Sequence, residues 1–339
     1  MGRTRAGASA SEAELLTIER PPGDLLSRRL LFVSGKGGVG KTTVAAALAQ
    51  LAAQRGARVL VCEMDAKGAL AAAFDQPPFE FEPRRVPGGA DLFGMAMNTE
   101  DSLREYMRLF VRVPLVGRIG PLARTFDFVA DAAPGVKEIL AIGKLCYEVR
   151  ERHYDLVVVD AEASGHIVSQ IDAPRAITEL VKVGLIRDQT RWMLELLDDP
   201  EVTGLVVVTT PEEMPVNETL ELVDKVRAQT EVDVAAVIAN RVLPELFDAA
   251  QREAFTALQD PAPFELLADA AGPKVQTVLE ATRLAVARAD VAAGHLALLA
   301  ERLPAGLAVL QVPELFTRAS GRRAVQQVAE HLDDSLGGG

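Results

Sequence analysis

The stretch of sequence that decides the fold is Gly35-Lys36-Gly37-Gly38-Val39-Gly40-Lys41-Thr42. It follows the apolar run Leu30–Val33 and precedes the helical run Val44–Gln54, so it joins a predicted strand to a predicted helix. The stretch satisfies the pattern G-x-x-x-x-G-K-[ST], in which glycines let backbone N–H groups turn toward phosphate oxygens. The N-terminus of the following helix adds the positive end of its dipole. These features predict a phosphate-binding loop.

Within this loop, two side chains have predicted tasks. Lys41 is expected to reach the β- and γ-phosphates of a nucleotide, and the Thr42 hydroxyl is expected to bind Mg²⁺. The predicted nucleotide contacts of the loop are Gly35, Lys36, Gly37, Gly38, Val39, Gly40, Lys41, Thr42 and Thr43.

A dinucleotide site is the competing interpretation of the same glycines. Gly35, Gly37 and Gly40 also fit the spacing G-x-G-x-x-G, and Glu63 lies near the place of the ribose-binding acid. This interpretation leaves Lys41 without a role, so the phosphate loop is favoured.

Two acidic residues follow predicted strands. Asp160 comes directly after Leu156–Val159, which suits a Walker B aspartate that holds Mg²⁺ through water, although a helix cap is the simpler alternative. Asp65 lies just past Val59–Cys62, where a loop can reach the γ-phosphate and orient the attacking water. The alternative for Asp65 is an ordinary loop or capping residue.

Short β-rich runs alternate with helical stretches along the chain. Seven are found: Leu30–Val33, Val59–Cys62, Leu92–Met97, Leu156–Val159, Leu205–Thr209, Val234–Ala239 and Leu307–Val312. Several are continuous Val/Leu blocks, as in strands buried on both faces. The sequence therefore predicts an α/β fold with a mostly parallel, doubly wound sheet of the P-loop NTPase type.

The predicted organisation is a single domain over residues 29–335, with a flexible leader at 1–28 and a tail at 336–339. Nearly sixty residues separate the run that ends at Met97 from the run that begins at Leu156, far more than one crossover helix needs. We expect an inserted helical subdomain at about 99–153.

Composition limits the function classes. The 339 residues include 36 Lys and Arg against 48 Asp and Glu, and the net charge of −12 disfavours nucleic acid as a partner. Cys62 and Cys146 are too few for a disulfide framework or a four-ligand zinc site. No apolar run approaches the roughly 20 residues of a membrane span. A cytoplasmic location is expected, with transient membrane association left open.

Gly35–Thr43 resembles the deviant Walker A box of a class that contains arsenite-pump, tail-anchored-protein-targeting, septum-positioning and chromosome-partitioning ATPases. Further segments are similar to boxes of the arsenite-pump/targeting family, in the family's order over about residues 29–320. Asp160–His166 resembles D-T-A-P-T-G-H, and Ala133–Glu138 resembles P-G-x-x-E. Pro211–Thr219 resembles P-E…E-T, and Asn240–Pro244 resembles N-[RQ]-x-[LV]-P.

The resemblance implies a Mg²⁺-dependent ATPase that works as a dimeric switch and binds ATP and ADP. In such a family member, Lys36 is the signature lysine that crosses to the partner's phosphates. Asp65 positions the attacking water, and Asp160 is the Walker B acid. Lys36, Lys41 and Asp65 are therefore the expected catalytic residues, and Thr42 and Asp160 the expected metal ligands.

The resemblance also implies nucleotide contacts outside the loop. Asn240 matches an adenine contact, and Glu218 matches a nucleotide contact near the subunit interface. Arg241 and Pro313 complete the predicted set of nucleotide-binding residues.

The sequence also departs from the family pattern at particular positions. Asp65-Ala66-Lys67-Gly68 stands where the family has D-P-A-H, and Ala161-Glu162-Ala163 stands where it has T-A-P. The turnover rate is therefore left open. The zinc C-x-x-C and the arsenite-binding cysteines are missing, so neither zinc nor arsenite is expected.

A partner subunit is expected because the chain has one phosphate loop. The partner is either a second copy or a related ATPase, and a weakly hydrolysing nucleotide sensor remains an alternative. A partitioning ATPase is disfavoured by the net charge, and a septum-positioning ATPase by Asp333-Asp334 near the end of the amphipathic stretch 320–336.

A protein client, such as a hydrophobic or membrane segment, is the further expectation from the family. Its groove would use apolar residues of the predicted insertion: Tyr106, Met107, Phe110, Val111, Leu115, Val116, Ile119, Leu122, Phe126 and Phe128. The alternative is that these side chains only cover the sheet and pack on one another.

Overall fold

The structure is a computed structural model, and it describes residues 22–88, 90–108, 135–180, 185–258, 260–272, 274–316 and 319–337. In this part of the chain, eight strands form one sheet in the order β3-β4-β2-β5-β1-β6-β7-β8. Their bounds are β1 Leu30–Gly35, β2 Val59–Glu63, β3 Arg84–Arg85, β4 Leu92–Ala96, β5 Leu156–Asp160, β6 Thr203–Thr209, β7 Val234–Val242 and β8 Ala308–Pro313.

The predicted parallel α/β sheet is confirmed, and all seven predicted strands are present. Every pairing is parallel except that of β3 with β4. β3 escaped prediction because it consists of two exposed arginines and carries no apolar signal. Every residue of β1, β2, β5 and β6 is buried, which explains their continuous Val/Leu composition.

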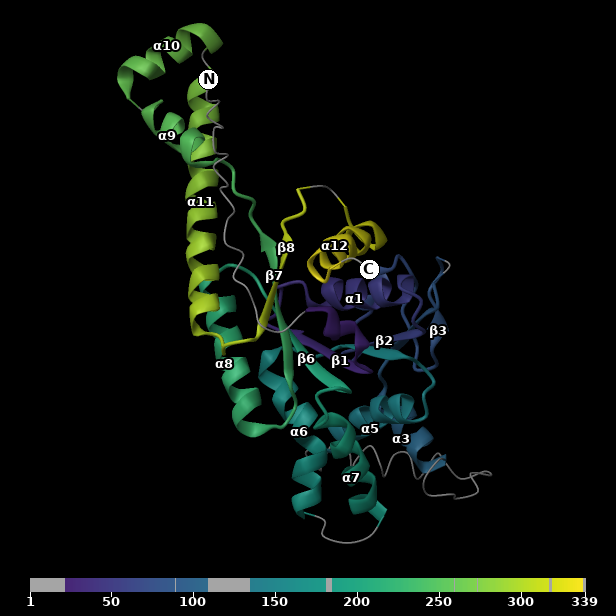
Figure 1. The fold of residues 1–339 in the computed structure, drawn as a ribbon. Coiled ribbons are helices and arrows are strands. Elements are labelled where there is room, and N and C mark those ends of the chain that lie inside the picture. Colours follow the sequence, from purple (N-terminus) through teal and green to yellow (C-terminus); the bar gives the residue numbers. More distant parts are fainter. Residues whose placement is uncertain are drawn as a thin grey trace, which may run out of the picture.

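The sheet is covered on both faces, so the doubly wound arrangement is also present (Figure 1). Leu31 and Val33 of β1 belong to the core beneath α1 (Lys41–Gln54), α2 (Ala69–Ala73) and α12 (Arg322–Ser335). Leu30 and Phe32, which point to the opposite face, belong to the second core. The helices on this second face are α5 Val136–Arg150, α6 Ser164–Leu180, α7 Leu185–Leu197 and α8 Glu213–Gln229.

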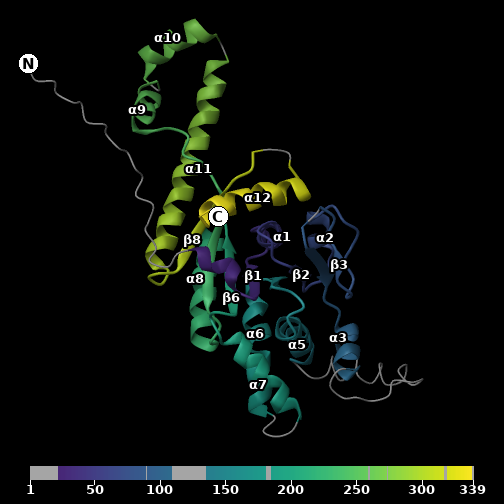
Figure 2. The same ribbon diagram turned by 45° about the vertical axis from the view of Figure 1, so that its right-hand side comes forward.

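A helical arm leaves the sheet between β7 and β8 (Figures 1 and 2). It consists of α9 (Ala249–Ala257), α10 (Pro261–Ala271) and α11 (Val275–Arg302). The C-terminal end of α11 packs into the second core through Leu299. The arm therefore begins and ends at the sheet although its far end projects away from it.

Helices also occupy the described part of the predicted insertion, between β4 and β5. Lys144 of α5 joins this helix to α3 (Thr99–Tyr106) through an ion pair with the partly buried Glu105 at 2.8 Å, and it also pairs with the buried Glu148 of α5 at 2.7 Å. Tyr106 and Met107 of the predicted apolar set are described; the members from Phe110 to Phe128 lie outside the described residues. The insertion as a separate subdomain stays a prediction.

Residues near both ends of the described chain pack against the sheet domain. A 3₁₀ helix, η1 (Pro22–Ser27), falls within the expected leader, and its Leu25 is buried in the first core. The buried Arg28 donates to the Thr203 carbonyl at 2.8 Å and pairs with Asp233 at 2.6 Å. Leu336, expected in the tail, is also buried. Leu25, Arg28 and Leu336 therefore pack on the domain, and the bounds 29–335 stay a prediction.

None of the helices in the described ranges is both long enough and apolar enough to cross a membrane.

Candidate active site

The predicted site residues lie where parallel strands end together. β1 lies between β5 and β6, and the register pairs Val33 with Asp160 and Gly35 with Val208. β2 lies beside β5, and Glu63 pairs with Asp160. The loops that follow β1, β2 and β5 therefore converge at one edge of the sheet, the usual position of a ligand site in an open parallel sheet.

The loop between β1 and α1 depends on two glycines. Gly35 has a φ of +147°, and a Cβ there would lie 2.1 Å from the Val208 carbonyl oxygen. Gly40 caps α1 with a φ of +95°, and a Cβ there would lie 2.4 Å from Asn240 Nδ2. Neither position has room for a side chain, so the backbone follows a path that is open to glycine alone. The loop thus brings the N-terminus of α1 toward the edge of the sheet.

Asn240 braces this loop from β7. Its Nδ2 donates a buried hydrogen bond to the Val39 carbonyl oxygen over 2.8 Å. The predicted adenine contact is therefore in direct contact with the phosphate loop, and one of its donors is used by the loop backbone.

Lys41, Thr42 and Asp160 come together as predicted. Burial raises the pKa of Asp160 to about 6, while a hydrogen bond from Thr42 and the charge of Lys41 act to lower it. Burial lowers the pKa of Lys41, and the carboxylates of Asp160 and Asp65 oppose that effect. Lys41 Nζ also donates to the Lys36 carbonyl oxygen at 3.3 Å. The Lys41 ammonium, the Thr42 hydroxyl and the Asp160 carboxylate therefore lie close together.

The Thr42–Asp160 pair fits a magnesium ion held jointly with a nucleotide. Mg²⁺ prefers oxygen donors and is usually bound by one or two carboxylates together with waters and phosphate oxygens. No group of three His, Cys, Asp or Glu side chains that could hold a metal occurs in the described ranges. The donor set therefore matches a phosphate-linked Mg²⁺.

Asp65 lies in the loop after β2 and forms an ion pair with Lys67. Its charge acts on both Lys41 and Asp160, so it lies within electrostatic range of the phosphate loop. Asp65 is 46% exposed, and its carboxylate is therefore accessible from solvent.

Glu63 has a structural use. It is buried, and its carboxylate accepts hydrogen bonds from the backbone N–H groups of Gly68 at 3.2 Å and Ala69 at 2.9 Å. These bonds satisfy donors at the start of α2. The acid that the dinucleotide interpretation requires is therefore already engaged by the protein's own backbone.

Lys36 forms an ion pair with Glu218 of α8 in the same chain. Ser164, the first residue of α6, donates to the other carboxylate oxygen of Glu218 at 3.5 Å. The phosphate loop, α6 and α8 therefore meet at Glu218. The sequence placed Lys36 and Glu218 in one site but gave no sign of their direct contact.

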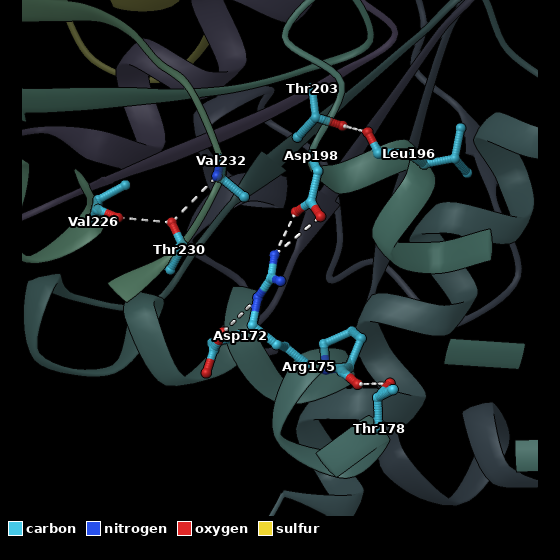
Figure 3. A network of polar contacts seen from close by, with 10 residues as sticks. Asp172, Arg175, Thr178, Leu196, Asp198, Thr203, Val226, Thr230 and Val232 are labelled. Atoms are coloured by element: carbon cyan, nitrogen blue, oxygen red, sulfur yellow. Dashed lines mark hydrogen bonds and ion pairs between the residues drawn. The ribbon is translucent and has the colours of Figure 1, made fainter. Parts of the chain in front are cut away.

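An ion pair holds α6, the helix that follows β5, against the C-terminal end of α7. Figure 3 shows Arg175 of α6 donating to both carboxylate oxygens of Asp198, at 2.9 and 3.0 Å. Thr203, at the start of β6, donates to the Leu196 carbonyl at 2.7 Å in the same network. These bonds tie α6 and the start of β6 to the C-terminal end of α7.

Arg241 and Pro313 lie at the neighbouring ends of β7 and β8. Arg241, with a φ of +58°, lines a cleft of about 650 Å³ between the ends of β7 and β8 and the arm. Pro313 ends β8 beside Val242 and does not line this cleft, whereas Glu314 and Phe316 do. The remaining walls come from Pro211, Glu212, Leu243 and the α11 residues Ala287, Arg288, Val291, Ala292 and His295. No sequence motif indicated that α11 contributes to this edge.

The geometry defines the class. A glycine-shaped loop between β1 and α1, a lysine and threonine at the helix start, and a buried aspartate at the end of β5 form the site of a P-loop nucleoside triphosphatase.

Comparison with known proteins specifies the family. The profile of the family described as Anion-transporting ATPase matches residues 28–193 and 180–260, and the chain belongs to this family and is an ATPase. The Mycobacterium tuberculosis protein named ATPase BagA is 33% identical over 291 residues, covering 80% of this chain and 85% of that protein. A Babesia bovis ATPase ASNA1 homolog is 26% identical, covering 64% and 67%. The ATPase get3 of Pyrenophora tritici-repentis is 24% identical, covering 70% and 80%.

The pKa of Asp160 leads to a prediction about stability and pH. The folded state holds this proton more tightly than the unfolded state, whose ordinary pKa is 3.8. The stabilisation from Asp160 is therefore fully present below pH 4 and is lost as the pH rises through 6, a change of about 3 kcal/mol. Asp160→Asn keeps a hydrogen-bond acceptor for Thr42 without the charge. We expect it to raise the free energy of unfolding at pH 7.5 without nucleotide, by about 1–3 kcal/mol.

Urea unfolding of both proteins at several pH values between 4 and 8 measures this effect. The difference between wild type and Asp160→Asn should grow between pH 4 and 7 and then level off. Parallel curves at all pH values would show that Asp160 does not titrate in this range. We expect added Mg·ATP to stabilise the wild type more than the variant, because the variant lacks the carboxylate predicted to hold Mg²⁺.

Proposed function

We propose that this ATPase is a Mg·ATP-driven switch in which hydrolysis is coupled to the closure of two subunits. The observation that carries the proposal is the convergence of the phosphate loop with Asp160 and Asp65 at one edge of the sheet. Backbone N–H groups of residues 35–42 would hold the phosphates, and Lys41 would neutralise charge on the β/γ oxygens. Thr42 and Asp160 would hold Mg²⁺, which supplies further charge neutralisation at these oxygens when bound.

Asp65 is the candidate for orienting the attacking water. The reaction forms a bond from the water oxygen to the γ-phosphorus and breaks the bond to the β–γ bridging oxygen, leaving ADP and phosphate. The half-exposed carboxylate of Asp65 is close enough to act on Lys41 electrostatically. Catalysis would rest on positioning and charge neutralisation, with no covalent intermediate.

We propose that Lys36 acts at the nucleotide site of the partner subunit. In its own chain it is paired with Glu218, and about a quarter of its side chain is exposed. Closure would transfer Lys36 from Glu218 to the phosphates bound by the partner, so that each site becomes complete in the dimer. The partner is a second copy of this chain or a related ATPase.

We propose that the switch acts on a protein client. We also propose that it does so in the cytoplasm. Support comes from the helices between β4 and β5 and from the apolar composition of residues 106–128. A hydrophobic segment, including one destined for a membrane, has the chemistry to fit such side chains. The net charge of −12 argues against nucleic acid.

Complementation between two inactive variants tests the role of Lys36 across the dimer. Lys36→Ala and Asp65→Asn should each be inactive alone. In a mixed dimer, nucleotide on the Lys36→Ala subunit would have Asp65 in its own chain and Lys36 from the partner. Mixing equal amounts should therefore restore about a quarter of the wild-type activity, since half of the dimers are mixed and each has one complete site.

Phosphate release measured over a series of mixing ratios checks this result. The activity should peak at the equal ratio and vanish for either variant alone. If the mixture is as inactive as its components although light scattering shows that dimers exchange subunits, Lys36 acts within its own chain.

A further inference from the structure

The loop after β2 is bent so that Lys67 reaches back to Asp65. Ala66, between them, has a left-handed φ of +47°. The base of the loop is fixed because the buried Glu63 carboxylate binds the N–H groups of Gly68 and Ala69. An alanine in this region of φ costs stability, and the surrounding structure has to maintain it. The result is an ion pair between Lys67 Nζ and Asp65 Oδ2.

Fold stability does not account for this pair. Lys67 is 73% exposed and Asp65 is 46% exposed, and water screens exposed ion pairs strongly. The ion pair therefore does little to offset the cost of the bend at Ala66. A strained turn that presents two charged side chains to solvent is typical of a functional site.

The pair lies within electrostatic range of the phosphate loop and of the segment that follows β5. The charge of Lys67 acts on Lys41 of the loop. The hydrogen bond to Asp65 raises the pKa of Lys67, and the carboxylates of Glu162, after β5, and Glu63 act in the same direction. Lys67 is thus a cation with a long flexible stem, paired with one acid and within electrostatic range of two others and of Lys41 in the phosphate loop.

We propose that Lys67 is a positioning residue that exchanges between two anions, the Asp65 carboxylate and the γ-phosphate of ATP. This inference rests on the proposed function. A terminal phosphate carries more negative charge than a carboxylate and has three acceptor oxygens, so it competes well for an ammonium. When Lys67 moves to the γ-phosphate, Asp65 Oδ2 becomes free to accept a hydrogen bond from the attacking water.

Through this exchange, Lys67 distinguishes ATP from ADP by the presence of the γ-phosphate. ADP offers no γ-phosphate, so Lys67 stays on Asp65 and contributes nothing to ADP affinity. ATP must displace the pair and gains a charge-assisted contact in return. Lys67 therefore favours ATP over ADP, and it releases Asp65 only when the substrate of hydrolysis is present.

Calorimetric titration with ADP and with a non-hydrolysable ATP analogue tests the proposal. Lys67→Ala should weaken binding of the analogue by about fivefold to tenfold and change ADP affinity by less than about twofold. Lys67→Arg should restore most of the lost affinity. Lys225→Ala, which removes a 58% exposed lysine of α8 that also pairs with a carboxylate, should change neither affinity.

The pair itself is tested by combining Lys67→Ala with Asp65→Asn. Asp65→Asn alone should strengthen binding of the ATP analogue by up to about fivefold, because no ion pair has to break. In the Lys67→Ala background the same substitution should have no such effect. Equal losses for ADP and the analogue, no loss for either, or faster turnover with unchanged affinity would each overturn the exchange.

Failure of the proposed ATP-driven switch would give other results than failure of the Lys67 exchange. If the wild type binds neither nucleotide, the proposed nucleotide switch is wrong, and if it binds both without dimerising, its homodimeric form is wrong. The ratio of the affinity for the ATP analogue to that for ADP, compared between wild type and Lys67→Ala, isolates Lys67, because the two proteins differ only in that side chain.

Discussion

Asp65→Asn is expected to lower the turnover number for ATP by about 100-fold to 1,000-fold without weakening ATP binding. The substitution keeps the size of the side chain and removes the negative charge that, in the proposed mechanism, would orient the attacking water. The residue is half-exposed and makes its ion pair with Lys67 on the surface, so the fold should tolerate the change. Phosphate release gives the turnover number, and calorimetry gives the affinity.

A matched control for this variant is Asp224→Asn, an exposed aspartate of α8 away from the phosphate loop. It should have wild-type turnover and affinity. A wild-type rate for Asp65→Asn would remove Asp65 from the mechanism. Loss of nucleotide binding in the variant would assign it to binding instead of to the chemical step.

Lys41→Met should weaken binding of both ATP and ADP by more than about 100-fold, the second large effect. Lys41 is partly buried beside Asp160 and Asp65, and its charge is the one that the β-phosphate would meet directly. Methionine keeps the apolar stem and removes the ammonium, so that only the charge-assisted contact is lost. Because ADP also carries the β-phosphate, the two nucleotides should suffer alike.

Thermal unfolding offers a direct readout for Lys41→Met. Mg·ATP should raise the Tm of the wild type and leave that of the variant unchanged, since a ligand stabilises only the protein that it binds. Lys225→Met, on the exposed surface of α8, should respond like the wild type. A Lys41→Met variant with intact nucleotide binding would contradict the assignment of the loop.

The central sheet and the phosphate loop could be predicted because their signals are local. Four strands are buried throughout and consist of apolar runs, while Gly35 and Gly40 are required by backbone conformation and close packing. The edge strand β3 could not be predicted, since two exposed arginines carry no pattern. The packing of Leu25 and Arg28 was missed because composition suggested a loose leader, whereas burial and the Asp233 ion pair depend on distant segments.

The site residues were found more readily than their contacts. Lys36, Glu218, Asp65 and Asn240 were named from the sequence, but the pairing of Lys36 with Glu218 joins positions 182 residues apart. The Asp65–Lys67 pair depends on the unusual φ of Ala66, which no propensity predicts. The walls that α11 adds to the cleft beside Arg241 depend on how the arm returns to the sheet.

Light scattering on a size-exclusion column tests the switch most directly. Wild type, Asp65→Asn and Lys36→Ala are compared without nucleotide and with Mg·ATP. The account predicts that Mg·ATP forms or tightens a dimer of the wild type, that Asp65→Asn holds this dimer because hydrolysis is blocked, and that Lys36→Ala weakens it. A chain that binds Mg·ATP and stays monomeric in all three forms would contradict the homodimeric switch and direct attention to a related ATPase as the second subunit.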